Sequence, residues 1–221
     1  MTERTPTDPR QDGRRLRGDR SRGPILAASI HMASEEGLES LTFGRVGSAA
    51  GVGKSNIQVL FGSREQLQLA TLDEAMARYR ARVVEPAMAG PTPLAQLTAL
   101  IDNWYCFVDH HELPGGCFLN AVSSEYRCRP GPIRERIERY RQAKRARFRE
   151  LIARAQDAGE LGGDLDVDDL VFRWVACEAV ANVAALMRDE EEFARARATA
   201  LAPLREGESP ATRTRAPTRR R

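Results

Sequence analysis

TFGRVGSAAGVGKSNIQVLFGSREQL, residues 42–67, is the stretch of sequence that decides the fold. Thr42 is a good N-cap for a short helix that reaches about Ala50, because its hydroxyl can accept a hydrogen bond from the first turn. Gly51-Val52-Gly53 then breaks the chain, and a second short helix is expected over 54–61. Two short helices with a tight glycine turn are typical of a helix-turn-helix, whose second helix lies in the major groove of DNA.

The predicted second helix has an apolar face and a polar face. Ile57 and Phe61 belong to the apolar face, and the small Ala49 and Ala50 would let the two helices cross closely. On the polar face, glutamine and asparagine can bond adenine, valine can contact a thymine methyl, and cations and helix starts suit phosphates. The alternative is a surface hairpin whose polar residues are only solvated. The predicted DNA contacts are Arg22, Thr42, Arg45, Lys54, Ser55, Asn56, Gln58, Val59, Ser63 and Arg64.

Helical periodicity continues on both sides of this stretch, and no segment alternates polar and apolar residues convincingly. Proline and glycine clusters separate the periodic segments, and Asp166 is a good N-cap. The sequence therefore predicts an all-α fold. Besides the two short helices, we expect helices over 24–36, 63 to about 86, 92–111, 116–128, 131–158, 166–187 and 189–202.

Both ends of the chain are basic. Residues 1–22 carry seven arginines against four acids, and 205–221 carry six against two, so the body of this +3 chain is mildly acidic. Neither end has enough apolar residues to order itself, and basic tails either meet a polyanion or are simply solvated. We expect a disordered arm over 1–21, a DNA-binding domain over 22–68, a helical ligand-binding and dimerisation domain over 69–204, and a disordered tail over 205–221.

Composition argues against several other classes of protein. No run of about 18 apolar residues and no secretory signal appears, so we expect a cytoplasmic protein that meets no membrane. The four cysteines show no C-x-x-C spacing, and the three histidines supply no metal-ligand pairs. We therefore expect reduced thiols, mostly as small core residues, with no metal site and no cofactor.

Residues 22–69 resemble the DNA-binding domain of the TetR family of bacterial transcriptional regulators. The shared pattern includes an apolar helix ending in E-x-G, then L-T, A-G-V-x-K, an F and S-R-E-x-L. Gln58 departs from it, because the family usually has a tyrosine there, and Leu60 replaces a frequent histidine or tyrosine. The residues that carry the resemblance are Ile25–Ala28, Glu35–Gly37, Leu41-Thr42, Ala50–Lys54, Ile57, Phe61 and Ser63–Leu67.

The resemblance implies a homodimer that binds a palindromic operator in double-stranded DNA and responds to a small-molecule effector. The segment 166–187 is apolar on nearly every face, which suits a four-helix bundle with 189–202 and a second copy, or else an internal core helix. Aromatic residues near the turn at Pro114-Gly115-Gly116 line an effector cavity or form ordinary core. The predicted ligand contacts are Trp104, Tyr105, Val108, Cys117, Phe118, Asn120, Trp174, Cys177, Glu178 and Asn182.

An enzymatic alternative rests on GSAAGVGKS, residues 47–55, which resembles a phosphate-binding P-loop. Its first glycine stands one position too early, and the preceding LTFGRV is a poor strand. Since no catalytic constellation is found elsewhere, we expect no enzyme. The sequence thus predicts a ligand-responsive regulator, most simply a repressor that a small molecule releases from its operator. A helical protein that binds only protein partners is the remaining alternative.

Overall fold

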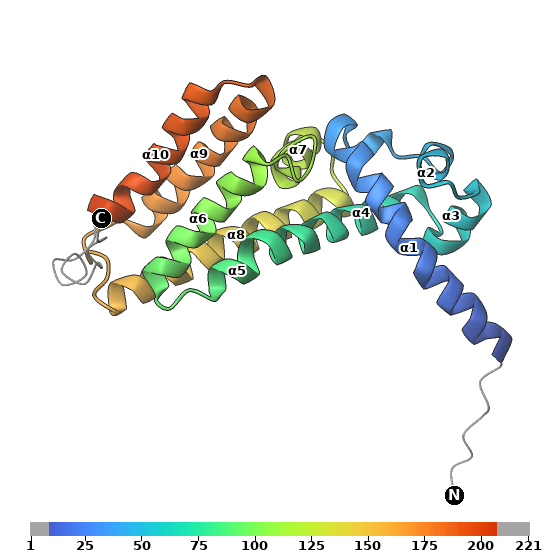
Figure 1. Ribbon diagram of the computed structural model, residues 1–221, viewed down its shortest axis with the longest axis horizontal. Coiled ribbons are helices and arrows are strands. Elements are labelled where there is room, and N and C mark those ends of the chain that lie inside the picture. The colour runs from blue at the N-terminus through green and yellow to red at the C-terminus, as the bar shows by residue number, and fades with distance from the viewer. Residues whose placement is uncertain (1–8, 207–221) are drawn as a thin grey trace, which may run out of the picture. The chain divides into compact units, whose positions relative to one another are not determined.

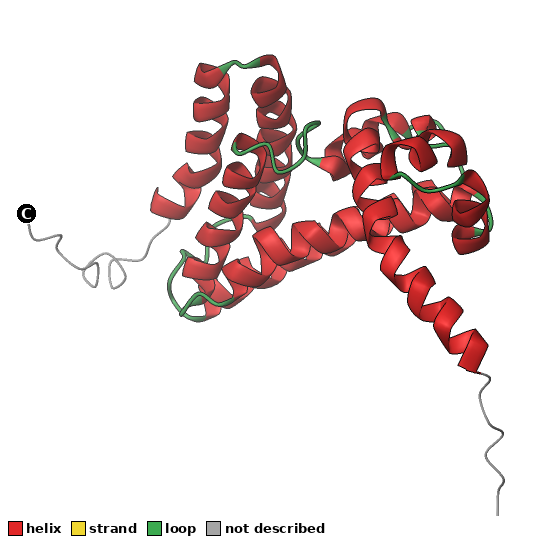
Figure 2. Ribbon diagram, turned by 45° about the vertical axis from the view of Figure 1, so that its right-hand side comes forward, coloured by secondary structure: helices red, strands yellow, loops and turns green. Residues whose placement is uncertain are grey.

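The computed structural model describes residues 9–206 of the chain, with side chains from Arg22 onward. Its elements over this range are all helical, as the sequence predicts (Figure 2). The chain divides into two compact units, Met1–Ala75 and Met76–Arg221. Most of the predicted N-terminal arm is backbone helix, but residues 1–8 and the tail segment 207–221 lie outside the described residues.

The first unit contains three full helices and the start of a fourth (Figure 1). Thr42 caps α2 as predicted, since its hydroxyl accepts a hydrogen bond from the Arg45 amide at 3.2 Å. Gly51 ends α2 in the left-handed region, at φ 66°, which glycine adopts without strain. The elements are α1 (Pro9–Glu36), the 3-10 turn η1 (Leu38–Ser40), α2 (Phe43–Ala50), α3 (Lys54–Phe61) and α4 (Arg64–Tyr79), which ends in the second unit.

The start of α1 differs from the prediction. We expected the first helix to begin near Pro24, yet the structure describes helix from Pro9 onward, with Pro24 inside it. We expected a disordered arm because this segment has too few apolar residues to bury in a core. Residues 9–21 do not need such burial in order to form a local helix. Arginine and glutamine are good helix formers, whereas Pro24 lacks the amide donor and costs the helix about 3 kcal/mol.

The close contact between α2 and α3 comes from a glycine and not from the alanines that we expected. Ala49 is exposed and Ala50 is only half-buried. A Cβ atom on Gly47 would lie 2.6 Å from the Val52 carbonyl oxygen and 3.5 Å from Cδ1 of Ile57. The turn and α3 therefore approach α2 where it has no side chain, and the Val52 amide donates to the Gly47 carbonyl at 2.9 Å.

The second unit follows the predicted helix pattern with two changes, one of which is that the last helix, expected over 189–202 with a disordered tail from 205, runs to Glu206. The helix expected to run to about Pro86 is interrupted by a π-helical segment, η2 (Arg80–Val84). Asp166 caps its helix as predicted, accepting from the amides of Asp168 and Asp169. The remaining elements are α5 (Glu85–Met88), α6 (Pro93–Asp109), α7 (Phe118–Glu125), α8 (Pro132–Asp157), α9 (Val167–Met187) and α10 (Glu190–Glu206).

Helices α6, α8, α9 and α10 pack around the core of the second unit (Figure 1). Trp174 of α9 is its centre: the indole stacks at a tilt on Phe148 of α8 with ring centroids 5.0 Å apart. The indole nitrogen also donates to the Ala200 carbonyl of α10 at 2.7 Å. Replacing a buried side chain of this size by alanine lowers the free energy of unfolding by about 3–5 kcal/mol.

Helix α9 corrects the statement that no segment is apolar enough to cross a membrane. It has 21 residues, and an 18-residue window has a mean hydropathy of 1.6. Length and composition alone are weak evidence, because the core helix of a water-soluble unit has the same properties. Here Trp174 and Leu170 enter the core, and the same helix carries the buried carboxylate of Glu178. The high hydropathy of α9 therefore comes from a buried face and from an exposed apolar side that includes Phe172 and Met187.

The cysteines also differ from the prediction that they are small core residues. Cys117 is buried, Cys177 is half-buried, and Cys106 and Cys128 are exposed. Among the described residues, no group of three or more histidine, cysteine or acidic side chains is arranged to hold a metal ion.

Candidate nucleic-acid interface and effector site

Helix α3 presents a continuous polar surface. Ile57 and Phe61 are buried against the first unit and fix the rotation of the helix about its axis. The predicted DNA-contacting residues Lys54, Ser55, Asn56, Gln58 and Val59 are exposed, and 85% of Val59 is accessible to solvent. An exposed valine among polar residues on an eight-residue helix offers a surface suited to the edges of bases.

The segment that resembles a P-loop is the end of α2, the turn and the start of α3. A P-loop follows a β-strand, and the structure has helix in that place.

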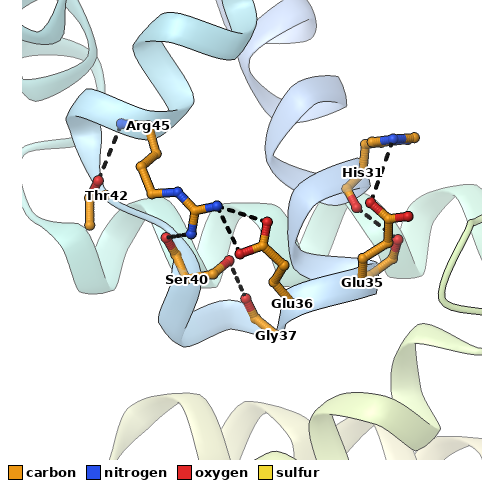
Figure 3. Close-up of polar contacts among 8 residues, drawn as sticks. His31, Glu35, Glu36, Gly37, Ser40, Thr42 and Arg45 are labelled. Carbon is orange, nitrogen blue, oxygen red and sulfur yellow. Dashed lines mark hydrogen bonds and ion pairs between the residues drawn. The ribbon is translucent and has the colours of Figure 1, made fainter.

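Arg45 is already bonded within the first unit (Figure 3). Its guanidinium donates to both carboxylate oxygens of Glu36 at 2.7 Å and to the Ser40 carbonyl at 3.2 Å. About half of the Arg45 side chain stays exposed. This arginine therefore ties α1 and η1 to the start of α2, and it would offer a phosphate only the donors that these bonds leave over.

Arg64 has a similar role at the start of α4. Its Nε donates to the Leu41 carbonyl at 2.8 Å, and its Nη2 bonds both the carbonyl and the carboxylate of Glu39. Ser63 accepts from the Gln66 amide at 3.1 Å, a hydrogen bond that caps the start of α4. Sequence reasoning missed Glu36 and Glu39 as partners, because only the tertiary fold brings these carboxylates next to the two arginines.

The other two predicted cations differ in their surroundings. The Arg22 guanidinium lies 4.6 Å from the ring centroid of Phe61, a cation–π contact between α1 and α3. Lys54 at the start of α3 has no ion pair or hydrogen bond from its ammonium to any residue that the structure describes. Of the predicted phosphate contacts, Lys54 thus has the charge that is most available to a nucleic acid.

The aromatic residues predicted to bind an effector form a packed core in the second unit. Trp104 and Tyr105 of α6 are 1% exposed, and Tyr105 makes edge contacts with Trp104 and with Phe193 of α10. Val108, Phe118 and Trp174 are buried as well. The hydroxyl of Tyr105 has no hydrogen-bond partner among the described residues. Such orphaned polar groups are costly in a core.

The polar members of the predicted set do come together, around an ion pair that sequence reasoning missed. Lys144 of α8 pairs with Glu178 of α9, and only 11% and 7% of their side chains are exposed. Asn120 donates to the Glu178 carbonyl at 3.3 Å, and the Asn182 side-chain oxygen accepts from the Cys117 amide at 2.6 Å. The position of Lys144, one turn before the buried Phe148, was the available signal.

Charges within this cluster stabilise one another. Burial alone would lower the pKa of Lys144, but the carboxylate of Glu178 raises it above its usual value, so the ammonium stays charged. Burial raises the pKa of Glu178, and Lys144 opposes this effect. Burial also raises the pKa of the Cys117 thiol, which keeps it protonated and unreactive.

Two cavities of the second unit differ in how they relate to the predicted effector contacts. Asn120 and Glu178 line a small cavity of about 20 Å³ between α7, α8 and α9. A larger open groove of about 920 Å³ runs along α6, α9 and α10, and none of the ten predicted residues lines it. Arg197 of α10 pairs with Asp102 of α6 at 2.7 Å in its wall. The aromatic residues of the prediction are therefore packed beside the small cavity or away from it.

Comparisons with known families agree with the two units. Residues 25–71 match the family model described as bacterial regulatory proteins of the tetR family. Residues 93–200 match the model described as the C-terminal domain of tetracyclin repressor-like proteins. Together the two matches cover more than two thirds of the chain.

Individual proteins extend this likeness. The HTH-type transcriptional regulator BetI of Rhizobium meliloti is 29% identical over 80 residues, 36% of this chain, and the chain spans about two fifths (39%) of that relative's length. The crystal structure of a TetR transcriptional regulator from Chloroflexus aurantiacus has a TM-score of 0.80 at 21% identity, covering 88% of this chain and 98% of that one. A cysteine mutant of the TetR family regulator CifR, complexed with 26-bp operator DNA, has a TM-score of 0.68 at 18% identity, covering 80% and 94%. The two structures share this fold.

Proposed function

Since the chain belongs to the TetR family of bacterial regulatory proteins, we propose that it is a dimeric, DNA-binding transcriptional repressor that a small-molecule effector releases from its operator. One observation carries the proposal: α3 combines a buried anchoring face with an exposed face of Lys54, Ser55, Asn56, Gln58 and Val59. A helix held in this way can enter a major groove with its side chains already directed at base edges.

Base reading and phosphate binding are divided among different residues. Asn56, Gln58 and Val59 contact base edges, and Lys54 and Ser55 bind phosphates near the start of α3. Thr42, Ser63 and the amides at the starts of α2 and α4 add contacts to the backbone of the duplex. Arg22, Arg45 and Arg64 support this surface from their positions on Phe61, Glu36 and Glu39.

Dimerisation through α9 and α10 places two such surfaces on one palindrome. Exposed apolar side chains follow one side of α9, including Phe172 at 72%, Val183 at 57% and Met187 at 76% exposure. The small exposed Ala176 and Ala179 of the same helix would allow a second copy to approach closely. Apolar stripes of this kind commonly mark an interface, and a two-fold dimer uses the same stripe from both copies.

Regulation follows from a difference in affinity between two states of the dimer. An effector bound in the second unit favours the state whose two α3 helices do not match successive major grooves, so operator affinity falls. Trp104, Tyr105, Val108, Cys117, Phe118, Asn120, Trp174, Cys177, Glu178 and Asn182 remain the proposed contacts. The buried aromatic members would have to open for an effector, which the orphaned hydroxyl of Tyr105 favours.

The function that we propose is binding and not catalysis, and its place is the cytoplasm, where the operator is. Purified protein should therefore hydrolyse no ATP or GTP, although residues 47–55 resemble a P-loop. Hydrolysis that is lost in a Lys54→Ala variant would instead favour the enzymatic alternative.

Fluorescence anisotropy tests the proposal directly. The full chain is titrated on the intergenic DNA beside its own gene and on shuffled DNA, at physiological ionic strength of about 0.15 M. Specific binding should exceed non-specific binding by about 10³-fold or more. Equal and weak binding to both DNAs would contradict an operator in that region. Failure to recover any preferred sequence in a genome-wide selection would contradict the proposal that the protein is a transcriptional regulator.

A further inference from the structure

The surface of α8 carries a concentration of positive charge that its neighbours only partly neutralise. This helix has nine basic residues against four acidic ones. Arg134, Arg149 and Arg154 are paired with Glu138, Asp168 and Glu150 at 3.0, 2.7 and 3.9 Å. Most of these pairs are exposed and serve as ordinary surface contacts.

Arg141 and Arg145 are different, because no described residue forms an ion pair or hydrogen bond with either guanidinium. They stand one turn apart on α8, and both are half-buried. Burial and the positive charge of Arg145 lower the pKa of Arg141, and Glu138, which opposes this effect, is already bonded to Arg134. Two half-buried like charges one turn apart are unfavourable for the isolated chain.

Both arginines line the small cavity between α7, α8 and α9. The buried Lys144–Glu178 pair forms its inner wall, and because these two charges neutralise one another, a net charge of about +2 remains from the arginines. Leu119 of α7 and Val175 of α9 form an apolar side, and Asn120 adds an amide. A volume of about 20 Å³ admits one or two small polar groups and not a whole effector.

We propose that Arg141 and Arg145 bind the carboxylate of an amphipathic organic anion, whose apolar part starts at Leu119 and Val175 and extends out through the open side of the cavity. A planar guanidinium matches a carboxylate in geometry and charge, and such charge-assisted hydrogen bonds are among the strongest in proteins. The anion also removes the repulsion between the two arginines, so the site gains stability when it is filled. This inference rests on the proposed function only where it identifies the anion as the effector. The binding site itself is argued from the cavity and its charges.

The Lys144–Glu178 pair couples this site to the core. Nζ of Lys144 lies 5.8 Å from the ring centroid of Trp104, one of the two tryptophans of the chain. An anion next to Arg141 and Arg145 attracts the neighbouring ammonium and weakens its hold on Glu178. Intrinsic tryptophan fluorescence therefore reports on binding without reference to DNA.

Titration of the full chain with octanoate, followed by tryptophan fluorescence, tests the proposal. Octanamide is the matched ligand control, since it has the same apolar body without the charge. The Arg141→Gln/Arg145→Gln variant should bind octanoate about 10-fold or more weakly, as the loss of charge-assisted bonds requires. Arg139→Gln is the matched protein control, because Arg139 is exposed on the same helix and does not line the cavity. Cooperative melting at or above the wild-type temperature shows that all variants fold.

The outcomes separate this inference from the proposed function. Octanoate that binds wild type no better than octanamide, or equally well to the double variant, overturns the anion site even if operator binding is intact. Binding that depends on both arginines supports the site even if no operator is found. Release of operator DNA by octanoate from wild type, but not from the double variant, makes the anion the effector.

Discussion

Single glycines decide how closely α2 and α3 can pack. A Cβ atom on Gly47 would meet the Val52 carbonyl oxygen at 2.6 Å, and that oxygen belongs to backbone that cannot rotate away. Gly44 lies on the same helix, and a Cβ there would have nothing within 4 Å. Gly47→Ala should therefore lower the free energy of unfolding by about 1–3 kcal/mol, whereas Gly44→Ala should raise it by about 0.5–1 kcal/mol. Urea denaturation measures both changes, and equal effects at the two positions would contradict this account.

At the same scale, Lys54 and Gln58 should affect DNA binding in different ways. Lys54→Ala should weaken binding to operator and shuffled DNA alike, and should reduce the salt slope of log K by about 1, because one phosphate contact is lost. Gln58→Ala should cost about 1–3 kcal/mol on the operator alone. Gln142→Ala, the same change at an exposed position of α8, is the control. A Gln58→Ala loss of equal size on both DNAs would mean that Gln58 contacts the backbone.

The elements could be predicted from sequence where local chemistry sets their limits. Thr42, Asp166 and Gly51 mark ends that the structure places as expected, because caps and left-handed turns act over a few residues. The π-helical segment and the start of α1 carry no such local signal. The partners of Arg45 and Lys144 were also missed, since these contacts join different helices and depend on how those helices pack. Candidate residues were thus identifiable by type and face, and their bonding was not.

The contact between α8 and α9 tests how a buried charge pair affects the elements that it joins. Lys144→Met should destabilise the fold by about 3–5 kcal/mol, because the buried carboxylate of Glu178 loses its partner. Lys144→Met/Glu178→Leu should recover most of this loss, since no uncompensated charge is left. Thermal melting of the two variants and wild type checks the prediction. A double variant that is no more stable than the single one would show that the pair is essential to packing.

For the whole molecule, the exposed apolar side of α9 predicts the assembly. Phe172, Val183 and Met187 would each lose much of their exposed surface in a dimer, at about 25 cal/mol for each Å² of apolar surface. A charge in the middle of this stripe would be buried without a partner, which costs several kcal/mol. Val183→Glu should therefore shift the protein to monomers in sedimentation equilibrium.

Monomers should in turn bind a palindromic operator much more weakly, because each half-site is then bound separately and the gain from a second linked contact is lost. A half-site duplex provides the comparison, since Val183→Glu should bind it as well as wild type does. Ala143→Glu is the matched control, because it places the same charge at an exposed position of α8. If Val183→Glu stays dimeric and keeps its operator affinity, the interface lies elsewhere on the second unit. If it is monomeric and still binds the full operator as tightly as wild type, DNA recognition does not depend on the dimer that the α9 stripe would form.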